Sequence, residues 1–369
     1  MRLTYIHNAE IPSRGASTVQ VMRMCSALVR LGCDVELIVP HYGEQEPLSG
    51  EESLSFYGCT DRFSLHRIRL GKGRWFGFAR TASKRAADRK SEIVFGRCVR
   101  SCAASAWRGL RVMHESHGPM EAYARSGRWA FRWLARSPHF LKLVVINQAL
   151  AKYYQAVFPA LSSEPLVAPS GTDPVEGAKP LVAAPLKGKL RIGYVGSLFP
   201  GKGMELIAEI AKRTSHEFIV IGGDDALVDE WKTRTGDNVT FLGFLPNREV
   251  GAQIEQFNIA LAPYGKEVSG GGTNFNLAAW MSPLKLFEYM AYARTIIASD
   301  LPAIREVVTD GVEVVLCDPQ DPDEWARAIE RLAQDQGLRE GLGRRALDTF
   351  LQGYTWEKRA RKILDAAGC

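Results

Sequence analysis

The stretch LRIGYVGSLFPGKGMELIAEIAKR, residues 190–213, indicates the fold class of this 369-residue chain. It opens with a mostly apolar run, Leu190–Val195, which is typical of a buried strand, and continues with the glycine-rich loop Gly196–Gly203. Helical periodicity follows over Met204–Arg213. Strand, glycine loop and helix in this order form the opening of a doubly wound α/β domain, whose first helix begins beside the carboxyl end of its first strand.

The same order of elements occurs at the start of the chain. Leu3–His7 reads as a short strand, a loop containing Gly15 follows, and a helical pattern stops at Gly32 before the next strand, Asp34–Val39. Two such series predict an α/β protein with two Rossmann-like domains that face each other across a cleft. The length of the chain also fits two domains better than one core.

Composition shifts place the domain boundaries. We expect one domain over residues 1–173, a Pro-, Ala- and Gly-rich linker over 174–189, a second domain over 190–351 and a last helix over 352–369. Further strands are expected at residues 65–68, 92–95, 110–114, 143–146 and 166–168, and at 217–221, 239–242, 259–262, 295–298 and 312–316.

The composition, with 46% hydrophobic and 24% charged residues, is that of a soluble globular protein. No run reaches the ~18 apolar residues of a membrane span, and the N-terminal stretch lacks the apolar core of a signal peptide. The seven cysteines form no C-x-x-C pair and favour free thiols, with Cys98 and Cys102 read as packed thiols and not as metal ligands. These features predict a cytoplasmic protein.

The charge distribution points to an anionic partner. The net charge is only +6, but residues 62–142 hold 19 Lys/Arg against four acids, a local net charge of +15. Aromatic side chains are interleaved with this charge in two clusters: Lys72, Arg74, Trp75, Phe76, Phe78 and Arg80; and Arg128, Trp129, Phe131, Arg132, Trp133, Arg136 and Lys142. We expect peripheral docking on the anionic inner face of the cytoplasmic membrane. A solvated helix face with core aromatics, or attraction of a soluble anionic glycan, are the alternatives. No recognised nucleic-acid-binding module is present, so no nucleic-acid partner is expected.

Three elements carry candidate chemistry. The first is the loop Gly196–Gly203, where glycines allow close approach of a ligand, the next helix offers free N–H groups, and Lys202 adds positive charge. This combination suits a diphosphate, although it lacks the Gly-Lys-Ser/Thr ending of a Walker loop. An ordinary strand-to-helix turn is the alternative.

The second element is the helix that begins SPLKLFEYMA. Ser282 is expected to cap it, with Pro283 in its first turn and the backbone amides of residues 284–286 aimed at an anion. Glu288, one turn further on, can accept hydrogen bonds from a ribose diol. Alternatively, Glu288 is a solvated helix carboxylate with Lys285 as its neighbour.

The third element, His114-Glu115-Ser116-His117-Gly118-Pro119, follows a strand at the edge where α/β proteins bind ligands. A histidine there can donate to a sugar hydroxyl or stabilise departing negative charge. A structural role for the histidine in a fixed loop is the alternative.

In this order, the elements resemble those of the family-4 retaining glycosyltransferases of GT-B fold, in a branch with a Ser-Pro-x-Lys-x-x-Glu variant. The resemblance covers nearly all of the chain: the Gly15 loop, Glu115–His117, Val167–Asp173, Gly196–Gly203, Val239–Pro246, Leu261–Tyr264, Ser282–Ala291 and Ser299–Val307.

The resemblance implies a role for each matching residue. Lys202 matches the lysine on the donor diphosphate, Glu288 the glutamate on the nucleotide ribose, and His117 the histidine near the transferred sugar. The first domain then faces the acceptor and the second binds the nucleotide sugar, while the last helix packs back on the first. The implied catalytic residues are His117 and Lys202, and the implied donor contacts are Gly15, Ser197, Lys202, Pro263, Tyr264, Ser282, Leu284, Lys285 and Glu288.

Two departures from the family pattern concern the donor sugar. Trp280 stands where the first glutamate of E-x7-E would fall, after the glycine-rich loop Gly270–Gly272. Ser197 stands where an arginine is common, so the diphosphate charge falls to Lys202 and Lys285.

The function implied is retaining transfer of a sugar from a nucleoside-diphosphate sugar to a glycan or lipid-linked acceptor, in cell-surface polysaccharide or glycolipid biosynthesis. We expect no cofactor and no metal ion, since Asp224 and Asp225 read as turn or capping residues. A sugar-nucleotide 2-epimerase of the same fold and a non-catalytic sugar-nucleotide-binding or membrane-binding module are the alternatives. A dehydrogenase is disfavoured because no G-x-G-x-x-G follows either opening strand.

Overall fold

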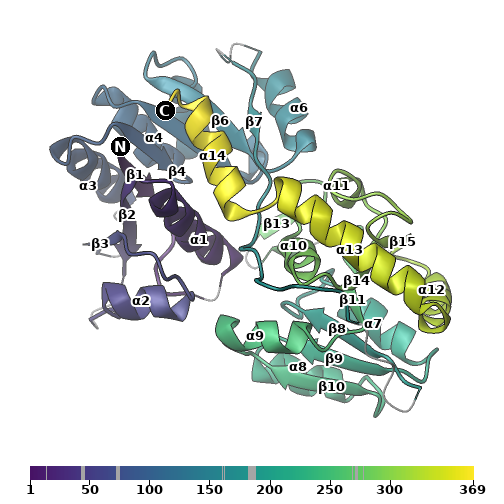
Figure 1. The fold of residues 1–369 in the computed structure, drawn as a ribbon. Coiled ribbons are helices and arrows are strands. Elements are labelled where there is room, and N and C mark those ends of the chain that lie inside the picture. Colours follow the sequence, from purple (N-terminus) through teal and green to yellow (C-terminus); the bar gives the residue numbers. More distant parts are fainter. Residues whose placement is uncertain are drawn as a thin grey trace. The chain divides into compact units, whose positions relative to one another are not determined.

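The computed structural model describes residues 1–13, 15–42, 46–71, 75–159, 161, 163–181, 188–267, 269–270, 273–276 and 278–369. The chain divides into two compact units, each with its own parallel sheet covered by helices (Figure 1). The first unit is Met1–Ser170 with Trp356–Cys369, and the second unit is Gly171–Thr355. Within the described ranges, no helix has both the length and the apolar character that a membrane span requires.

The first unit contains a seven-stranded parallel sheet in the order β3-β2-β1-β4-β5-β6-β7. Its strands are β1 (Arg2–Ile6), β2 (Asp34–His41), β3 (Ser64–Arg69), β4 (Ile93–Gly96), β5 (Val112–Ser116), β6 (Phe140–Val145) and β7 (Leu166–Val167). The chain winds from β1 to β3 in one direction and then returns to β4 on the other side of β1. The pair β1–β4 is therefore the point at which the strand order reverses.

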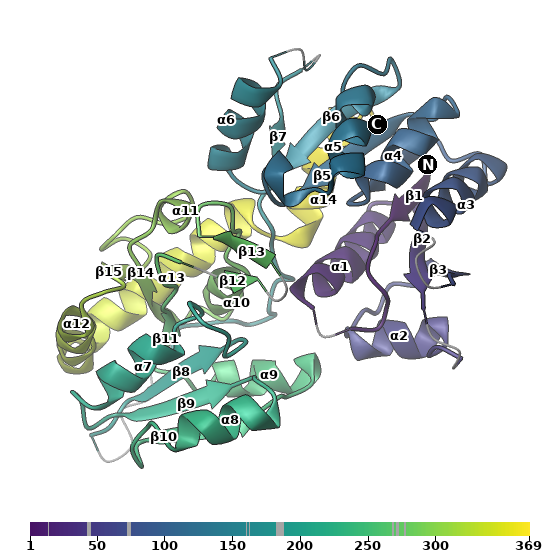
Figure 2. The ribbon, with the colours of Figure 1, turned by 180° about the vertical axis from the view of Figure 1, so that it is seen from behind.

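The helices of the first unit cover both faces of this sheet (Figures 1 and 2). They are α1 (Ala16–Arg30), α2 (Gly50–Phe56), α3 (Trp75–Asp88), α4 (Val99–Trp107), α5 (Arg125–Leu134), α6 (Gln148–Val157), α14 (Trp356–Ala366) and the short 3₁₀ turn η1 (Met120–Ala122). Helix α14, from the end of the chain, packs beside α1 on one face. Helices α3, α4 and α5 form a row on the other face, as right-handed crossovers require.

The second unit contains a six-stranded parallel sheet in the order β10-β9-β8-β11-β14-β15. Its strands are β8 (Arg191–Val195), β9 (Glu217–Ile221), β10 (Val239–Gly243), β11 (Ile259–Ala262), β14 (Thr295–Ser299) and β15 (Val315–Cys317), with a separate antiparallel pair β12 (Ser269–Gly270) and β13 (Thr273–Asn276). Its helices are α7 (Met204–Ala211), α8 (Asp225–Lys232), α9 (Asn247–Ile254), α10 (Leu284–Ala291), α11 (Pro302–Arg305), α12 (Pro322–Gln334) and α13 (Gln336–Gly353). The strand order reverses here between β8 and β11.

The α/β fold class with two Rossmann-like domains is confirmed, with local differences from the sequence-based expectations. The strand expected at residues 312–316 starts only at Val315, because Gly311 turns the chain at a φ of +71° and the Glu313 carboxylate accepts a hydrogen bond from the backbone of Thr309. The antiparallel pair β12–β13 was not predicted, since its residues are mostly small and polar. Of the linker expected at 174–189, residues 182–187 lie outside the described part of the chain.

Candidate functional site

The glycine loop of the second unit lies at the carboxyl edge of the sheet, where the strand order reverses. Gly203 immediately precedes α7 and has a φ of +112°. A Cβ atom on Gly203 would lie 2.3 Å from the carbonyl oxygen of Pro263, the first residue after β11. The backbone N–H of Gly265 donates to the carbonyl of Gly201. Glycine therefore allows the start of α7 and the loop after β11 to meet, and the free amides of α7 open onto this edge.

A buried tyrosine holds the glycine loop in place. The hydroxyl of Tyr194, on β8, lies 2.8 Å from the carbonyl of Ser197 and 3.0 Å from that of Lys202 and donates toward both. Burial raises the pKa of Tyr194 well above its usual value, so its hydroxyl keeps its proton. Ser197 thus contributes a backbone acceptor to the loop structure.

Lys285 brings an ammonium group into this protein interior. Its Nζ lies 3.9 Å from the ring centre of Tyr194 and 4.6 Å from that of Tyr264. Gly196 makes room for it, since a Cβ there would lie 3.0 Å from Nζ. Among the described residues, Nζ has no hydrogen-bond partner. Burial, reinforced by the charge of Lys202, lowers the pKa of Lys285 well below its usual value.

The charges around this edge are unbalanced. Burial also lowers the pKa of Lys202, which has no ion-pair partner among the residues that the structure describes. The carboxylate of Glu288, on α10 one turn after Lys285, partly opposes the shift at Lys285. Two lysines, two aromatic rings and a helix N-terminus suit a ligand with more than one negative charge, such as a diphosphate.

The start of α10 differs from the sequence-based expectation. Pro283, not Ser282, is the N-cap residue, and no side chain caps the helix. The amides of Leu284 and Leu286 donate to the carbonyls of Ser282 and Pro283, so two of the three amides expected to face an anion already have partners. The proline cannot offer a capping side chain, and the backbone compensates with these tight turns. Lys285, not the helix N-terminus, therefore carries the positive charge of α10.

The remaining residues expected in the second unit lie as follows. Pro263 and Tyr264 come directly after β11, with Tyr264 buried beside Lys285. Residues 271 and 272 of the glycine-rich loop lie outside the described residues. Asp224 caps α8 by accepting from the amide of Leu227, as expected for a capping residue.

The first unit holds a cluster of polar side chains around the Glu115 carboxylate, at the carboxyl end of β5. Four side chains donate to it: Tyr5 Oη at 2.9 Å, Gln20 Nε2 at 2.6 Å, His117 Nε2 at 2.5 Å and Arg359 Nη2 at 2.8 Å. Burial alone raises the pKa of Glu115, but the nearby Arg359 and His117 hold it well below its usual value. Glu115 is thus a buried anion with a complete set of donors.

His117 is the partly accessible member of this cluster, with 21% of its side chain exposed. Burial and the charge of Arg97 outweigh Glu115 and lower its pKa to about 4, so its ring is neutral at physiological pH. Because Glu115 is ionised, Nε2 carries the ring proton and donates to it, which leaves Nδ1 as an acceptor. His117 is therefore suited to accept a hydrogen bond from a ligand hydroxyl, whereas the sequence interpretation made it a donor.

Sequence reasoning did not find three neighbours of this cluster. His7 ends the first strand region with both ring nitrogens buried and without a partner among the described residues. Arg97, after β4, donates to Gln20 Oε1 at 2.7 Å. His7 and Arg97 follow strands β1 and β4, so the rule that ligand sites lie at carboxyl ends could have identified them. Arg359 comes from the far end of the chain, and no local signal points to it. Gly15 precedes α1, with an ordinary extended φ of −72°.

The chain matches two family models, which together span most of its length. Residues 17–176 match the model described as Glycosyltransferase Family 4. Residues 189–335 match the model described as Glycosyl transferases group 1.

Among curated proteins, the chain is similar to a phosphatidyl-myo-inositol mannosyltransferase of Mycolicibacterium smegmatis, with 28% identity over 58% of this chain and 54% of the relative. It is also similar to an α-D-kanosaminyltransferase of Streptomyces kanamyceticus, with 26% identity over 42% of this chain and 39% of the relative. The chain thus matches about half, or less, of the length of these relatives.

Among solved structures, HepE of Anabaena in complex with UDP has a TM-score of 0.72 at 13% identity, covering 100% of both chains. Sucrose-phosphate synthase of Thermosynechococcus elongatus has a TM-score of 0.70 at 16% identity, covering 100% of this chain and 98% of that one. These likenesses confirm the fold.

Replacing Lys285 with methionine should separate stability from ligand binding. The substitution removes a buried amino group that has no hydrogen-bond partner among the described residues, so the free energy of unfolding should stay the same or rise, by up to ~1–3 kcal/mol. Affinity for a nucleoside diphosphate should fall roughly 10- to 100-fold, because one charge-assisted contact is lost. Denaturant titration and calorimetry measure the two effects.

Calorimetry in buffers of different ionisation enthalpy measures the number of protons taken up when the ligand binds. An anionic ligand raises the lowered pKa of Lys285, so binding should take up protons in the pH range between the two values. The methionine variant should lose this uptake. Unchanged nucleotide affinity and proton uptake in the variant would remove Lys285 from the ligand site.

Replacing Arg359 with methionine should destabilise the first unit strongly. Its side chain is 2% exposed and pairs with a fully buried Glu115, so its loss leaves an uncompensated buried charge, at a cost of ~3–5 kcal/mol. The matched control is Arg361→Met on the same helix, where the side chain is 62% exposed and pairs with Glu357. That change should cost below ~1 kcal/mol in urea unfolding. Equal losses in the two variants would contradict the assigned role of the buried pair.

Proposed function

This chain is a family-4 glycosyltransferase of GT-B fold, and on this premise we propose that it moves a sugar from a nucleoside-diphosphate sugar to a glycan or lipid-linked acceptor with retention of anomeric configuration. The transfer needs neither a metal ion nor a cofactor. The acceptor belongs to the biosynthesis of a cell-surface polysaccharide or glycolipid.

The observation that carries this proposal is the buried amino group of Lys285. An ammonium without a hydrogen-bond acceptor is costly inside a protein, and its position at the strand-order reversal is where α/β proteins bind nucleotides. A donor diphosphate supplies the missing negative charge. Lys202 then contacts the same diphosphate from the glycine loop, while the Glu288 carboxylate accepts hydrogen bonds from the hydroxyls of the ribose.

The positive groups of this edge support metal-independent chemistry. The bond that breaks joins the anomeric carbon to the terminal phosphate, so negative charge develops on the departing diphosphate. Lys202, Lys285 and the N-terminus of α7 stabilise this charge, the same task that a divalent ion performs in other transferases. The released phosphate oxygen takes the proton of the acceptor hydroxyl as that hydroxyl attacks from the same face, which gives retention.

His117 contributes from the acceptor-side unit. Its neutral ring, held by Glu115, presents Nδ1 as an acceptor to a hydroxyl of the transferred sugar. The names of the relatives support the sugar-transferase class: one is a mannosyltransferase and another a kanosaminyltransferase, while HepE is seen with UDP and with UDP-glucose.

Lys202→Ala should lower kcat/KM by roughly 10²–10³, equivalent to ~3–4 kcal/mol of lost transition-state stabilisation, while the thermal unfolding temperature stays unchanged. The matched control is Lys212→Ala, an exposed lysine just after α7 that pairs with Glu209. It should leave kcat/KM within a factor of two of wild type. Activity of Lys202→Ala close to that of the control would refute the assignment.

The reaction class itself is tested on the product. A donor that supports turnover is first found by thermal-shift screening, since bound donor stabilises the fold. NMR of the product should show the anomeric configuration of the donor, and turnover should continue in excess chelator. An inverted linkage would contradict retention, and loss of turnover in chelator would contradict metal independence.

A further inference from the structure

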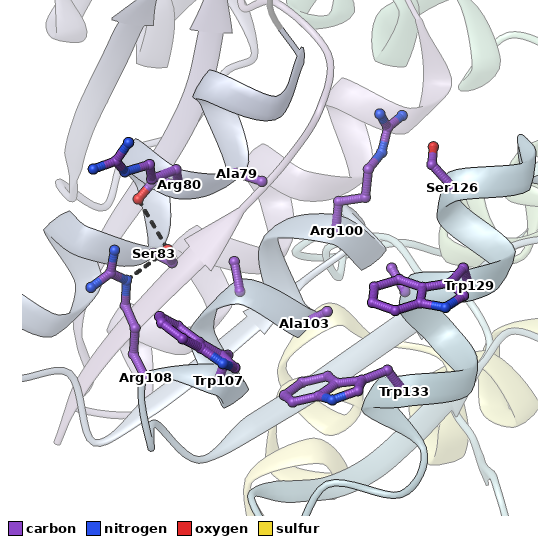
Figure 3. A pocket seen from close by; sticks show the side chains of 12 residues that line it. Ala79, Arg80, Ser83, Arg100, Ala103, Trp107, Arg108, Ser126, Trp129 and Trp133 are labelled. Atoms are coloured by element: carbon purple, nitrogen blue, oxygen red, sulfur yellow. Dashed lines mark hydrogen bonds between the residues drawn. The ribbon is translucent and has the colours of Figure 1, made fainter.

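A groove on the first unit lies on the helix row α3, α4 and α5 and uses none of the residues around Glu115. Its volume is about 480 Å³. Figure 3 shows three indole rings, those of Trp107, Trp129 and Trp133, along one side, with arginine side chains around the rim. Alanines from all three helices form much of its floor. The groove is therefore apolar inside and basic at its edge.

The tryptophans of the groove are exposed to an unusual degree. Trp107 is 74% exposed and Trp129 is 70% exposed, the highest values for large hydrophobic side chains in the described part of the chain. By contrast, Trp231, Trp325 and Trp356 are buried. Two neighbouring exposed indoles beside an apolar groove are the mark of a surface that is covered in use.

The charge of this surface has one sign. Arg80, Arg100 and Arg108 line the groove, and none of its described lining residues carries a carboxylate. Neither Arg80 nor Arg108 forms an ion pair among the described residues, and Arg108 Nε instead donates to Ser83 Oγ at 3.1 Å. Three further arginines are exposed on or beside helix α5. Arg125 is its first residue, Arg132 lies in its last turn and Arg136 follows its end.

Helix α5 carries two of its basic residues at the end where its dipole disfavours positive charge. Its first turn contains Arg125 and Arg128 and no acidic residue, although a helix N-terminus favours negative charge. In the second unit, α7, α8, α9 and α12 each have an acidic residue in the first turn, whereas α10 and α13, like α1 and α4 of the first unit, have none. Arg125 and Arg128 therefore gain nothing from the helix dipole, whereas Arg132, in the last turn, is favoured by it.

We propose that this tryptophan–arginine groove is a docking surface for an anionic lipid bilayer, with the indoles of Trp107 and Trp129 at the headgroup boundary and the arginines on lipid phosphates. Indoles suit this boundary because one edge is polar and the rest is apolar. Each arginine near the anionic surface adds an attraction that salt weakens. The acyl chains reach the alanine floor between the rings.

The polar groups of the groove distinguish a bilayer from a soluble glycan. Sugar hydroxyls both donate and accept hydrogen bonds, so glycan sites combine donors with carboxylate or amide acceptors. The lining side chains include arginines and serines but no Asp, Glu, Asn or Gln. Lipid phosphates and acyl chains need only the donors and the apolar surface that the groove offers.

The structure also corrects the basic aromatic clusters expected from the sequence. Phe78 and Phe131 belong to the core and are fully buried. Lys72 and Arg74 lie outside the described residues. Trp107, which belongs to neither cluster in the sequence, joins Trp129 and Trp133 only because α4 lies between α3 and α5.

The test measures binding of the full chain to vesicles of phosphatidylcholine alone and of phosphatidylcholine with phosphatidylglycerol, at low and high salt. Docking requires co-sedimentation with the anionic vesicles, weakened by salt, and little with the neutral ones. Brominated acyl chains should quench the fluorescence of the wild-type protein. The double variant Trp107→Ser/Trp129→Ser should lose most of this quenching. Its affinity for the anionic vesicles should fall by at least roughly tenfold.

Charge is tested separately. Arg80→Gln/Arg132→Gln should weaken binding to anionic vesicles by up to roughly 30-fold at low salt, about 1 kcal/mol for each arginine. The matched control Arg331→Gln/Arg344→Gln removes two exposed arginines from the second unit and should bind as the wild type does. Leu351→Ser, at a position exposed on α13, is the control for the tryptophans.

Affinity for nucleoside diphosphate should be unchanged in every one of these variants. A negative result with vesicles would therefore count against membrane docking and not against the proposed transfer. Equal binding of the tryptophan variant and the wild type would overturn the proposal. So would absence of quenching by brominated lipids, or binding of soluble polygalacturonate that depends on the same tryptophans without any vesicle binding.

Discussion

Each of the two large sheets of this protein is all parallel and starts from a central strand, and this constraint governs where chemistry is possible. Right-handed crossovers carry the chain outward in one direction and then back to the other side of the first strand. The loops after the two central strands therefore separate at the carboxyl edge, and space for a ligand remains there. In the second unit this edge brings together the glycine loop, the residues after β11 and the start of α10. In the first unit it brings together His7, Arg97 and the Glu115 cluster.

The two edges handle charge in opposite ways. Around Glu115, a buried anion receives four donors and is complete within the first unit. The hydrogen bond to Glu115 fixes the tautomer of His117, while burial and the charge of Arg97 keep its ring neutral. Around Lys285, a buried amino group lies against two aromatic faces and has no hydrogen-bond partner among the described residues. The Glu115 cluster positions the ring of His117 to bind a neutral hydroxyl. The surroundings of Lys285 favour the binding of an anion.

The helix row of the first unit follows a third pattern, because its basic charge lies on the outer face and not at a strand end. Exposed indoles, arginines and alanines line one groove on this face. This surface belongs to the first unit, whereas the glycine loop and Lys285 belong to the second.

The sequence alone determined the fold class and most strands, because a buried parallel strand must be apolar and must be followed by a turn, and both leave local signals. It also located the glycine loop, Lys202, Glu288 and His117 near strand or helix ends. It could not show that Lys285 is buried between two tyrosines, that Pro283 begins α10, or that Arg359 reaches Glu115 from the other end of the chain. Nor could it separate Trp107 and Trp129, which face outward, from Phe78 and Phe131, which face the core. Burial, protonation and partnership depend on which segments meet in space, and distant segments meet only through tertiary packing.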